Sequence, residues 1–127
     1  MAIDEVGDLR LATVVVNVQD MDRAIEFWTE ALGYVRRDHE QDPTFTVLVD
    51  PDRRKPAVSL QLSDKPRREP TPVHLDLYTA EQDRHVERLV ALGATRAEDW
   101  PYPDDPDFIV LRDPDGNEFC VIDQAGE

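Results

Sequence analysis

The strongest fold signal in this chain lies near its C-terminus, in Asp113-Pro114-Asp115-Gly116-Asn117-Glu118-Phe119-Cys120-Val121. An apolar run from Phe108 to Leu111 leads into this stretch, and polar and apolar residues alternate at its end. Proline presets a backbone φ that suits a tight turn, and glycine tolerates a positive φ, so a turn connects the two runs. The stretch therefore predicts a β-hairpin.

The rest of the chain contains two copies of one strand–helix unit. Residues 13–20 and 73–79 each alternate as a strand does and end on a residue type that caps helices. Apolar residues at helical spacing follow in both copies, until a Leu-Gly pair stops each pattern. We expect helices near residues 20–32 and 80–92.

The two predicted helices begin and end with local signals. Asp20 is suited to accept the free N–H groups of the first helix, and Thr79 with Gln82 has the spacing of a capping box for the second. Gly33 and Gly93 follow the last apolar residue of each helix, where a left-handed residue commonly ends a helix. These signals place both helices directly after the first strand of their unit.

Three short strand signals follow each helix, and the order β-α-β-β-β therefore occurs twice. They lie at residues 34–37, 45–49, 57–62, 95–98, 108–111 and 118–122. We expect an α+β fold in a single domain, 1–127, made of module one at 9–62 and module two at 73–123. Residues 63–72 are charged and rich in proline, which is typical of an exposed linker.

The composition narrows the class of protein. A chain of 127 residues is long enough for one domain, and its single cysteine forms no internal disulfide. The N-terminal residues lack the basic and apolar regions of a signal peptide, and no apolar run approaches the roughly 20 residues that span a bilayer. We expect a cytoplasmic protein.

The charge excludes some partners more firmly than it selects others. Fourteen Lys and Arg against 28 Asp and Glu give a formal net charge of −14. Nucleic acids and anionic membranes are repelled by such a surface, so we expect neither as a partner. A cationic small ligand is attracted to it, although acidic surfaces also serve solubility alone.

The first strand of module two separates polar from apolar residues cleanly. Since successive strand residues face opposite sides of a sheet, Val73, Leu75 and Leu77 lie under the helix. The opposite face receives His74, Asp76 and Tyr78. Asp76 is placed to orient the His74 ring or raise its basicity, and such a pair is able to act as a general acid–base without a metal. A histidine that merely hydrogen-bonds a neighbour in the sheet is the alternative.

At this point the chain resembles the vicinal oxygen chelate superfamily, which includes glyoxalase I, bleomycin-resistance proteins, extradiol dioxygenases and fosfomycin-resistance enzymes. The resemblance lies in Val18 to Trp28 with Ala31 to Tyr34, and in Asp113 to Glu118. It implies two βαβββ modules whose mixed sheets curl into a cup, with helices on the outer face. It also implies that a small molecule binds on the concave face and that a homodimer often completes the cup.

The resemblance implies four metal-ligand positions, which in this chain are Thr13, Gln61, His74 and Cys120. Threonine is a poor ligand and cysteine is soft, so this set does not suit the usual hard divalent ion. A register shift of two residues would replace Cys120 by Glu118 and give the set Gln61, His74 and Glu118. We expect no metal and no other cofactor, with a divalent metal at this second set as the alternative.

Other candidate site residues come from several elements of the chain. Trp100 and Tyr102 lie in a proline-rich acidic loop that either closes over the cup or only connects two strands. Cys120 reads as a small buried hydrophobe rather than a nucleophile, because no Lys or Arg lies nearby in sequence. By strand parity we expect one cavity to collect Thr13, Asn17, Gln61, His74, Asp76, Tyr78 and Cys120, all as ligand-binding residues except the catalytic pair His74 and Asp76.

The function expected from these residues is that of a small-molecule-binding, glyoxalase-like protein with a degenerate metal site. It either sequesters its ligand, as resistance proteins of the superfamily do, or acts as a metal-independent enzyme through His74 and Asp76. A metal-dependent lyase, isomerase or dioxygenase is the alternative, and a noncatalytic interaction module is a third reading. Metal catalysis predicts a bound metal, whereas an interaction module predicts a cup that is filled by side chains.

Overall fold

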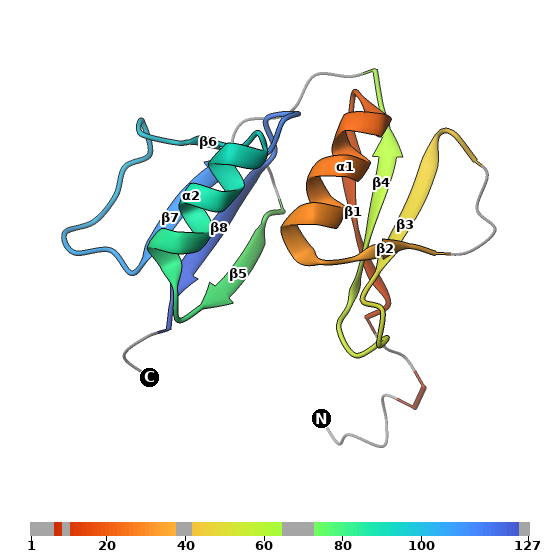
Figure 1. Ribbon diagram of the computed structural model, residues 1–127, viewed down its shortest axis with the longest axis horizontal. Helices are drawn as coiled ribbons and strands as arrows, with labels where there is room; N and C mark the ends of the chain where they lie inside the picture. The colour runs from red at the N-terminus through yellow and green to blue at the C-terminus, as the bar shows by residue number, and fades with distance from the viewer. Residues whose placement is uncertain (1–6, 9–10, 38–41, 65–72, 125–127) are drawn as a thin grey trace.

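The computed structural model describes residues 7–8, 11–37, 42–64 and 73–124. Most of the predicted linker, residues 65–72, lies outside them. Module one contains β1 (Thr13–Val18), α1 (Met21–Leu32), β2 (Val35–Arg36), β3 (Phe45–Val49) and β4 (Ala57–Leu62). Module two contains β5 (Leu75–Thr79), α2 (Gln82–Leu92), β6 (Thr95–Arg96), β7 (Phe108–Arg112) and β8 (Glu118–Asp123). Figure 1 shows the two modules side by side, each with one helix on the same side of its sheet.

The strand order is the same in both modules, which confirms the predicted duplication. The strands run β1-β4-β3-β2 in the first sheet and β5-β8-β7-β6 in the second. In each sheet the first strand pairs in parallel with the last, and the other pairs are antiparallel. The crossover helix makes the parallel pair possible. Strands β1 and β5 consequently lie at the edges of two separate sheets.

Helix α1 begins and ends as its sequence predicts. The Asp20 side chain accepts a hydrogen bond from the Arg23 N–H at 3.1 Å, which satisfies one free donor of the first turn. Gly33 adopts φ +69°, and its N–H donates to the Thr29 carbonyl at 2.9 Å. A residue with a side chain is strained in this left-handed conformation, so glycine ends the helix.

Helix α2 begins differently from the prediction, because Thr79 and Gln82 do not form a capping box. Thr79 ends β5, and the helix starts only at Gln82, with Glu81 as its N-cap residue. The Thr79 hydroxyl accepts from the Glu81 N–H at 2.9 Å, while the Gln82 amide donates to the carbonyls of Asp107 and Val121. Gln82 therefore joins the helix to its sheet instead of capping it.

One hydrophobic core extends through both modules. Trp28 and Phe27 of α1 and Phe119 of β8 are buried, with at most 2% of each residue exposed. The Trp28 ring lies 5.0 Å from that of Phe27 and 5.1 Å from that of Phe119, and both pairs meet edge to face. Since Phe119 belongs to the other module, these rings join the modules through apolar contact.

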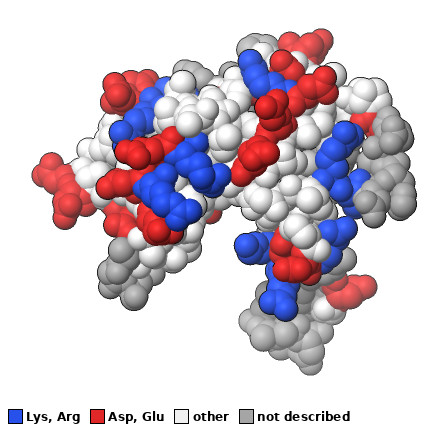
Figure 2. All heavy atoms as spheres, viewed as in Figure 1, with Lys and Arg blue, Asp and Glu red and all other residues white. Residues whose placement is uncertain are grey.

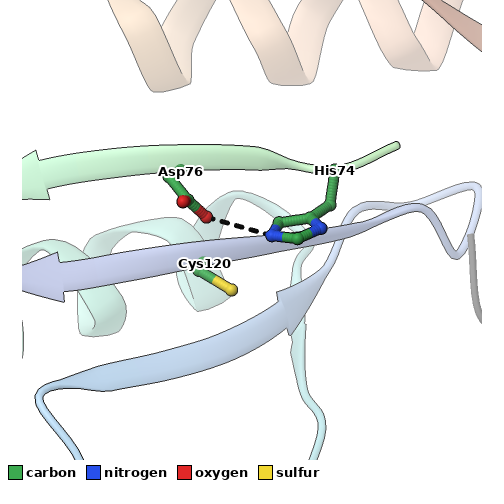
Figure 3. A group of neighbouring side chains, drawn as sticks. All are labelled: His74, Asp76 and Cys120. Atoms are coloured by element: carbon green, nitrogen blue, oxygen red, sulfur yellow. Dashed lines mark ion pairs between the residues drawn. The ribbon is translucent and has the colours of Figure 1, made fainter. Parts of the chain in front are cut away.

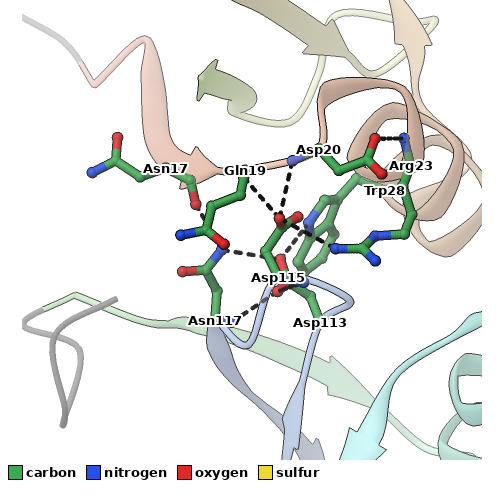
Figure 4. Close-up of polar contacts among 8 residues, drawn as sticks. All are labelled: Asn17, Gln19, Asp20, Arg23, Trp28, Asp113, Asp115 and Asn117. Carbon is green, nitrogen blue, oxygen red and sulfur yellow. Dashed lines mark hydrogen bonds and ion pairs between the residues drawn. The ribbon is translucent and has the colours of Figure 1, made fainter. Parts of the chain in front are cut away.

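Polar contacts reinforce this junction at the turn between β7 and β8. Asp113 accepts a hydrogen bond from the Trp28 indole at 3.1 Å. Asp115 accepts from the backbone N–H groups of Gln19, at 2.8 Å, and Asp20, and its carboxylate lies 3.5 Å from the Arg23 guanidinium. Figure 4 shows this turn inserted against the start of α1. The predicted hairpin thus also fastens module two to module one.

The other end of α1 is also held by module two. Arg88 of α2 donates to the carbonyls of Glu30 and Ala31, at 3.1 and 2.9 Å, where the helix has free acceptors. Both helices are short, and no helix of the described residues has the length and apolar character needed to cross a membrane.

Candidate functional site

A pocket of about 470 Å³ lies on the face of the second sheet that points away from α2. It is lined by His74, Asp76, Tyr78, Trp100, Asp107, Phe108, Cys120, Ile122 and Gln124. All of these residues belong to module two or directly follow it. The register explains the convergence, because Asp76 lies beside Cys120 and Tyr78 beside Ile122 in the parallel pair. A pocket of this volume suits a small molecule.

The polar end of the pocket holds the predicted pair His74 and Asp76. His74 directly precedes β5, and its Nε2 atom lies 3.2 Å from Asp76 Oδ1. The His74 side chain is 51% exposed and that of Asp76 46%, so solvent and ligands reach both groups. Figure 3 shows both side chains together with Cys120 of the neighbouring strand. The carboxylate is positioned to hold the imidazole in one orientation.

Cys120 lies beside this pair and is half-buried. Burial raises the pKa of its thiol to about 11, and the negative charge of Asp76 contributes in the same direction. The thiolate is the nucleophilic form of cysteine, so a raised pKa makes the thiol a weaker nucleophile at neutral pH when no cation is bound beside it. This agrees with the expectation that Cys120 is not a nucleophile.

Glu118 shares the face of Cys120 but does not join the group. Its carboxylate lies 3.3 Å from the Arg112 guanidinium, and only 7% of its side chain is exposed. Arg112 also binds Asp99, whose pKa it holds below the ordinary value. The structure therefore shows no register shift that places Glu118 with His74, and Cys120 occupies that position.

The predicted site residues of module one do not line this pocket. Thr13, Asn17 and Gln61 lie on the first sheet, where Asn17 and Gln61 are neighbours in the pairing of β1 with β4. The Thr13 hydroxyl lies 2.7 Å from that of Ser59, and the Asn17 carbonyl accepts from the Asn117 side chain. Strand parity predicts which face of a sheet these residues occupy, but it does not predict how far apart the two sheets lie. Within one chain, these residues therefore do not reach the pocket that contains His74.

The predicted aromatic loop between β6 and β7 contributes one of its two aromatic residues. Trp100 lines the pocket. Tyr102 is not among the lining residues, because its hydroxyl accepts the Val110 N–H at 2.9 Å and its ring lies 5.6 Å from that of Phe108. Tyr102 therefore anchors the loop to β7, and Trp100 forms part of the wall.

Four lining residues are not among the site residues that the sequence predicts: Asp107, Phe108, Ile122 and Gln124. Phe108 and Ile122 are direct neighbours in the pairing of β7 with β8, and Ile122 shares the parity of Cys120. That parity was a sufficient signal for Ile122. Asp107 and Gln124 lie at strand ends, where loop paths decide the direction of a side chain.

A second hollow, of about 590 Å³, lies between the two modules on their helix side. Its walls are largely apolar, with Leu32, Leu75 and Leu77 among them. Two of its polar residues have structural partners, since Arg88 binds the end of α1 and also donates to His85, and Tyr34 donates to the Pro56 carbonyl. Asp76 and Tyr78 line both this hollow and the smaller pocket. His74 and Cys120 line the smaller pocket and not this hollow.

The residues at the four positions implied by the superfamily do not fit a hard divalent ion. They offer a hydroxyl, an amide, an imidazole and a thiol, without a carboxylate, and the Thr13 hydroxyl is bonded to Ser59. A different group does have the composition of a metal site. One ligand atom each from His74, Asp76 and Cys120 lie within 4.8 Å of one another.

Comparisons with known proteins agree with this fold. The profile of the glyoxalase-like domain family matches residues 13–122. Comparison with curated proteins finds no significant match. Among solved structures, a glyoxalase/bleomycin resistance protein/dioxygenase family enzyme from Burkholderia phytofirmans PsJN is 19% identical, with a TM-score of 0.69 over 91% of this chain and 98% of that one.

Two other solved structures extend the likeness. The fosfomycin resistance protein FosX from Listeria monocytogenes, as a variant complexed with Mn(II) and a dihydroxypropylphosphonic acid, is 17% identical, with a TM-score of 0.69 over 94% of this chain and 91% of that one. The trypanothione-dependent glyoxalase I of Leishmania major is 18% identical, with a TM-score of 0.63 over 92% and 88% of the two chains. At such identities these likenesses show the fold alone. With its doubled βαβββ unit and the match over residues 13–122, the chain belongs to the glyoxalase-like domain family, within the vicinal oxygen chelate superfamily.

Proposed function

We propose that this protein binds a small organic molecule in the pocket over the second sheet. The observation that carries the proposal is that the His74–Asp76 pair meets aromatic and apolar walls in a space of about 470 Å³. A few polar groups set among apolar walls are typical of small-molecule sites. The pocket is open rather than filled by side chains, which argues against a pure interaction module.

The lining of the pocket favours a positively charged ligand. Asp76 and Asp107 belong to it, and the described residues that line it include no Lys or Arg. The face of Trp100 or Tyr78 also attracts a cation. A ligand with an aromatic part and an ammonium group therefore suits the pocket better than a carboxylate of the same size.

Benzylammonium and benzoate, two probes of similar size and opposite charge, test this proposal. Added to protein treated with a chelator, benzylammonium is expected to quench tryptophan fluorescence at the lower concentration. His74→Ala should weaken that binding, whereas His85→Ala, which alters a histidine outside the pocket, should not. If the unaltered protein binds benzylammonium and benzoate equally well, and if His74→Ala changes the binding of neither probe, this pocket is not the site.

A second candidate function is metal-independent proton transfer, favoured by the 3.2 Å contact between His74 and Asp76. A histidine oriented by a carboxylate and open to solvent is able to take a proton from a bound substrate. Asp76→Asn keeps the shape of the side chain but removes its charge. For an enzyme, this change should lower turnover more than it lowers binding of the same substrate.

We also propose that a second copy of the chain completes the pocket. Strands β1 and β5 are sheet edges, and edges with unpaired backbone groups favour pairing with another chain. Val15 on β1 is 47% exposed and Tyr78 on β5 is 64% exposed. A partner that pairs with either edge would bring its first sheet, with Thr13, Asn17 and Gln61, toward the second sheet.

Light scattering on two matched variants tests the dimer. Val15→Asp places a charge on the proposed interface, and Val35→Asp places one on β2 at the opposite edge, where the side chain is equally exposed at 45%. We expect Val15→Asp to be monomeric and Val35→Asp to remain dimeric. A monomeric mass for the unaltered protein at working concentration would contradict the proposal.

A further inference from the structure

Three possible metal ligands from two adjacent strands meet at the polar end of the pocket. The parallel register of β5 and β8 places Asp76 directly beside Cys120, and His74 lies two residues before Asp76 on the same face. One ligand atom of each side chain lies within 4.8 Å of the other two. The three side chains point toward a common space in Figure 3. The arrangement depends on no residue of module one.

We infer that His74, Asp76 and Cys120 form a binding site for Zn²⁺, with one coordination position left open. An imidazole nitrogen, a carboxylate oxygen and a thiolate sulfur are the ligand types that zinc takes, at distances of about 2.0–2.3 Å. Three protein ligands with an open fourth position are typical of catalytic zinc sites. Mn²⁺ and Mg²⁺ favour oxygen ligands and are poorly served by a thiolate.

The acidic side chains of the pocket and the net charge of module two favour a cation: Asp76 and Asp107 line the pocket. Module two holds 13 Asp and Glu against four Lys and Arg, whereas module one holds nine against seven. On the helix side of the molecule, which is not the face that bears the pocket, Figure 2 shows acidic side chains along the outer edge of module two, a basic cluster beside them, and basic side chains around the lower end of module one. On binding, the Cys120 S–H bond breaks, its electron pair bonds the zinc and the proton leaves to solvent, as thiolate ligation requires.

The ligands are able to reach zinc without disturbing the core. His74 and Asp76 are about half exposed, so their side chains can close around an ion by rotation alone. Glu118, the other carboxylate on this face, stays with Arg112. The site shares His74 and Cys120 with the positions implied by the superfamily, but it adds Asp76 and takes no ligand from module one. The inference goes beyond the proposed function, since it requires no organic ligand.

Metal titration of chelator-treated protein tests the inference with Zn²⁺ and Co²⁺ themselves as probes. We expect one Zn²⁺ per chain in competition with a chromophoric chelator, and no displacement by an equal concentration of Mn²⁺. Co²⁺ should give an intense near-ultraviolet sulfur-to-cobalt band together with the visible bands of a four-coordinate ion. Cys120→Ser should abolish the sulfur band.

Matched variants separate this site from adventitious binding. His74→Ala and Asp76→Asn should each weaken zinc binding roughly tenfold or more, in line with the sensitivity of metal sites to their ligands and supporting groups. His85→Ala should leave it unchanged, and thermal melts establish that each variant is folded. Absence of zinc binding, a cobalt spectrum without the sulfur band, or binding that His74→Ala leaves intact would overturn the inference. None of these results depends on benzylammonium, so the small-molecule proposal is tested separately.

Discussion

The turns between the last two strands of each module share one local structure but have different roles. Asp50 in module one accepts from the N–H groups of Asp52 and Arg54, and Asp113 in module two accepts from those of Asp115 and Asn117. The second turn also reaches the other module, through Asp115. Local sequence thus builds the same turn twice, and its position in the molecule decides that one of them fastens the modules together.

The two turns also differ at their fourth residue, which is Gly116 in module two and Arg53 in module one. Gly116 has φ +90°, which costs glycine little, whereas Arg53 at the matching position has φ +58°. An arginine in this conformation carries a strain of about 1–2 kcal/mol. Its guanidinium compensates in part by donating to the Asp50 carbonyl at 3.0 Å. The turn that docks against α1 is therefore the relaxed one.

Loss of the aromatic contact between the two modules should lower the free energy of unfolding the most. Trp28→Ala deletes the ring that contacts Phe119 of the other module, and we expect the free energy of unfolding to fall by about 3–5 kcal/mol. Trp28→Phe keeps a ring but leaves Asp113 without the indole donor, and we expect the free energy of unfolding to fall by about 1–3 kcal/mol. Urea denaturation measures both changes. A loss below about 1 kcal/mol for Trp28→Ala would mean that the modules do not share a core.

The two turns themselves can be compared by deleting one matched carboxylate from each. Asp115→Ala removes the acceptor for two backbone N–H groups directly before α1, those of Gln19 and Asp20, and the partner of Arg23, so we expect a loss of about 1–3 kcal/mol. Asp52→Ala, at the matching exposed position of module one, should change stability by less than about 0.5 kcal/mol. Equal losses in urea denaturation would show that the second turn does not fasten the modules.

The contributions of Asp50 and Asp113, the first carboxylate of each turn, to the free energy of unfolding should change with pH in opposite directions. Burial raises the pKa of Asp113 above its ordinary 3.8. Burial also raises that of Asp50, but the N–H groups of Arg54 and Asp52 and the charge of Lys55 outweigh it, so its pKa is lowered. A raised pKa contributes stability that is lost as pH rises above 3.8, and a lowered one contributes stability that is lost as pH falls below 3.8.

Differences between the unaltered protein and each Asp→Asn variant isolate these contributions from all other titrating groups. As pH rises above 3.8, the stability advantage over Asp113→Asn should shrink. As pH falls below 3.8, the advantage over Asp50→Asn should shrink. Urea denaturation across this range provides the measurement. Differences of the same sign for both turns would contradict the assignment.

The smallest effect on stability is expected at the candidate site. His74→Ala removes a side chain that is 51% exposed, so the free energy of unfolding should change by less than about 0.5 kcal/mol. Leu75→Ala removes a partly buried side chain from the opposite face and should cost about 1–3 kcal/mol. Thermal melts distinguish the two. A silent Leu75 variant beside an unfolded His74 variant would invert the two faces of the second sheet.

The secondary-structure elements and their order follow from local signals along the chain. Strand and helix periods, the Asp20 cap, the Gly33 stop and the turn at Asp113 all depend on neighbouring residues, so they can be recognised locally. Parity along β5 and β8 likewise assigned His74, Asp76 and Cys120 to one face. The capping box at Thr79 failed because β5 continues to that residue, and pairing with β8 outweighs a local helix signal.

How the two modules meet depends on the packing of the whole molecule and could not be predicted from local signals. In the folded molecule Asp115 lies against the start of α1, Thr13 and Gln61 lie away from His74, and the Glu118 carboxylate pairs with Arg112. Each of these outcomes depends on distances between residues far apart in the chain. Such distances follow from how the aromatic core and the two sheets pack, and packing is set by the summed contacts of many side chains rather than by the pattern of any one segment.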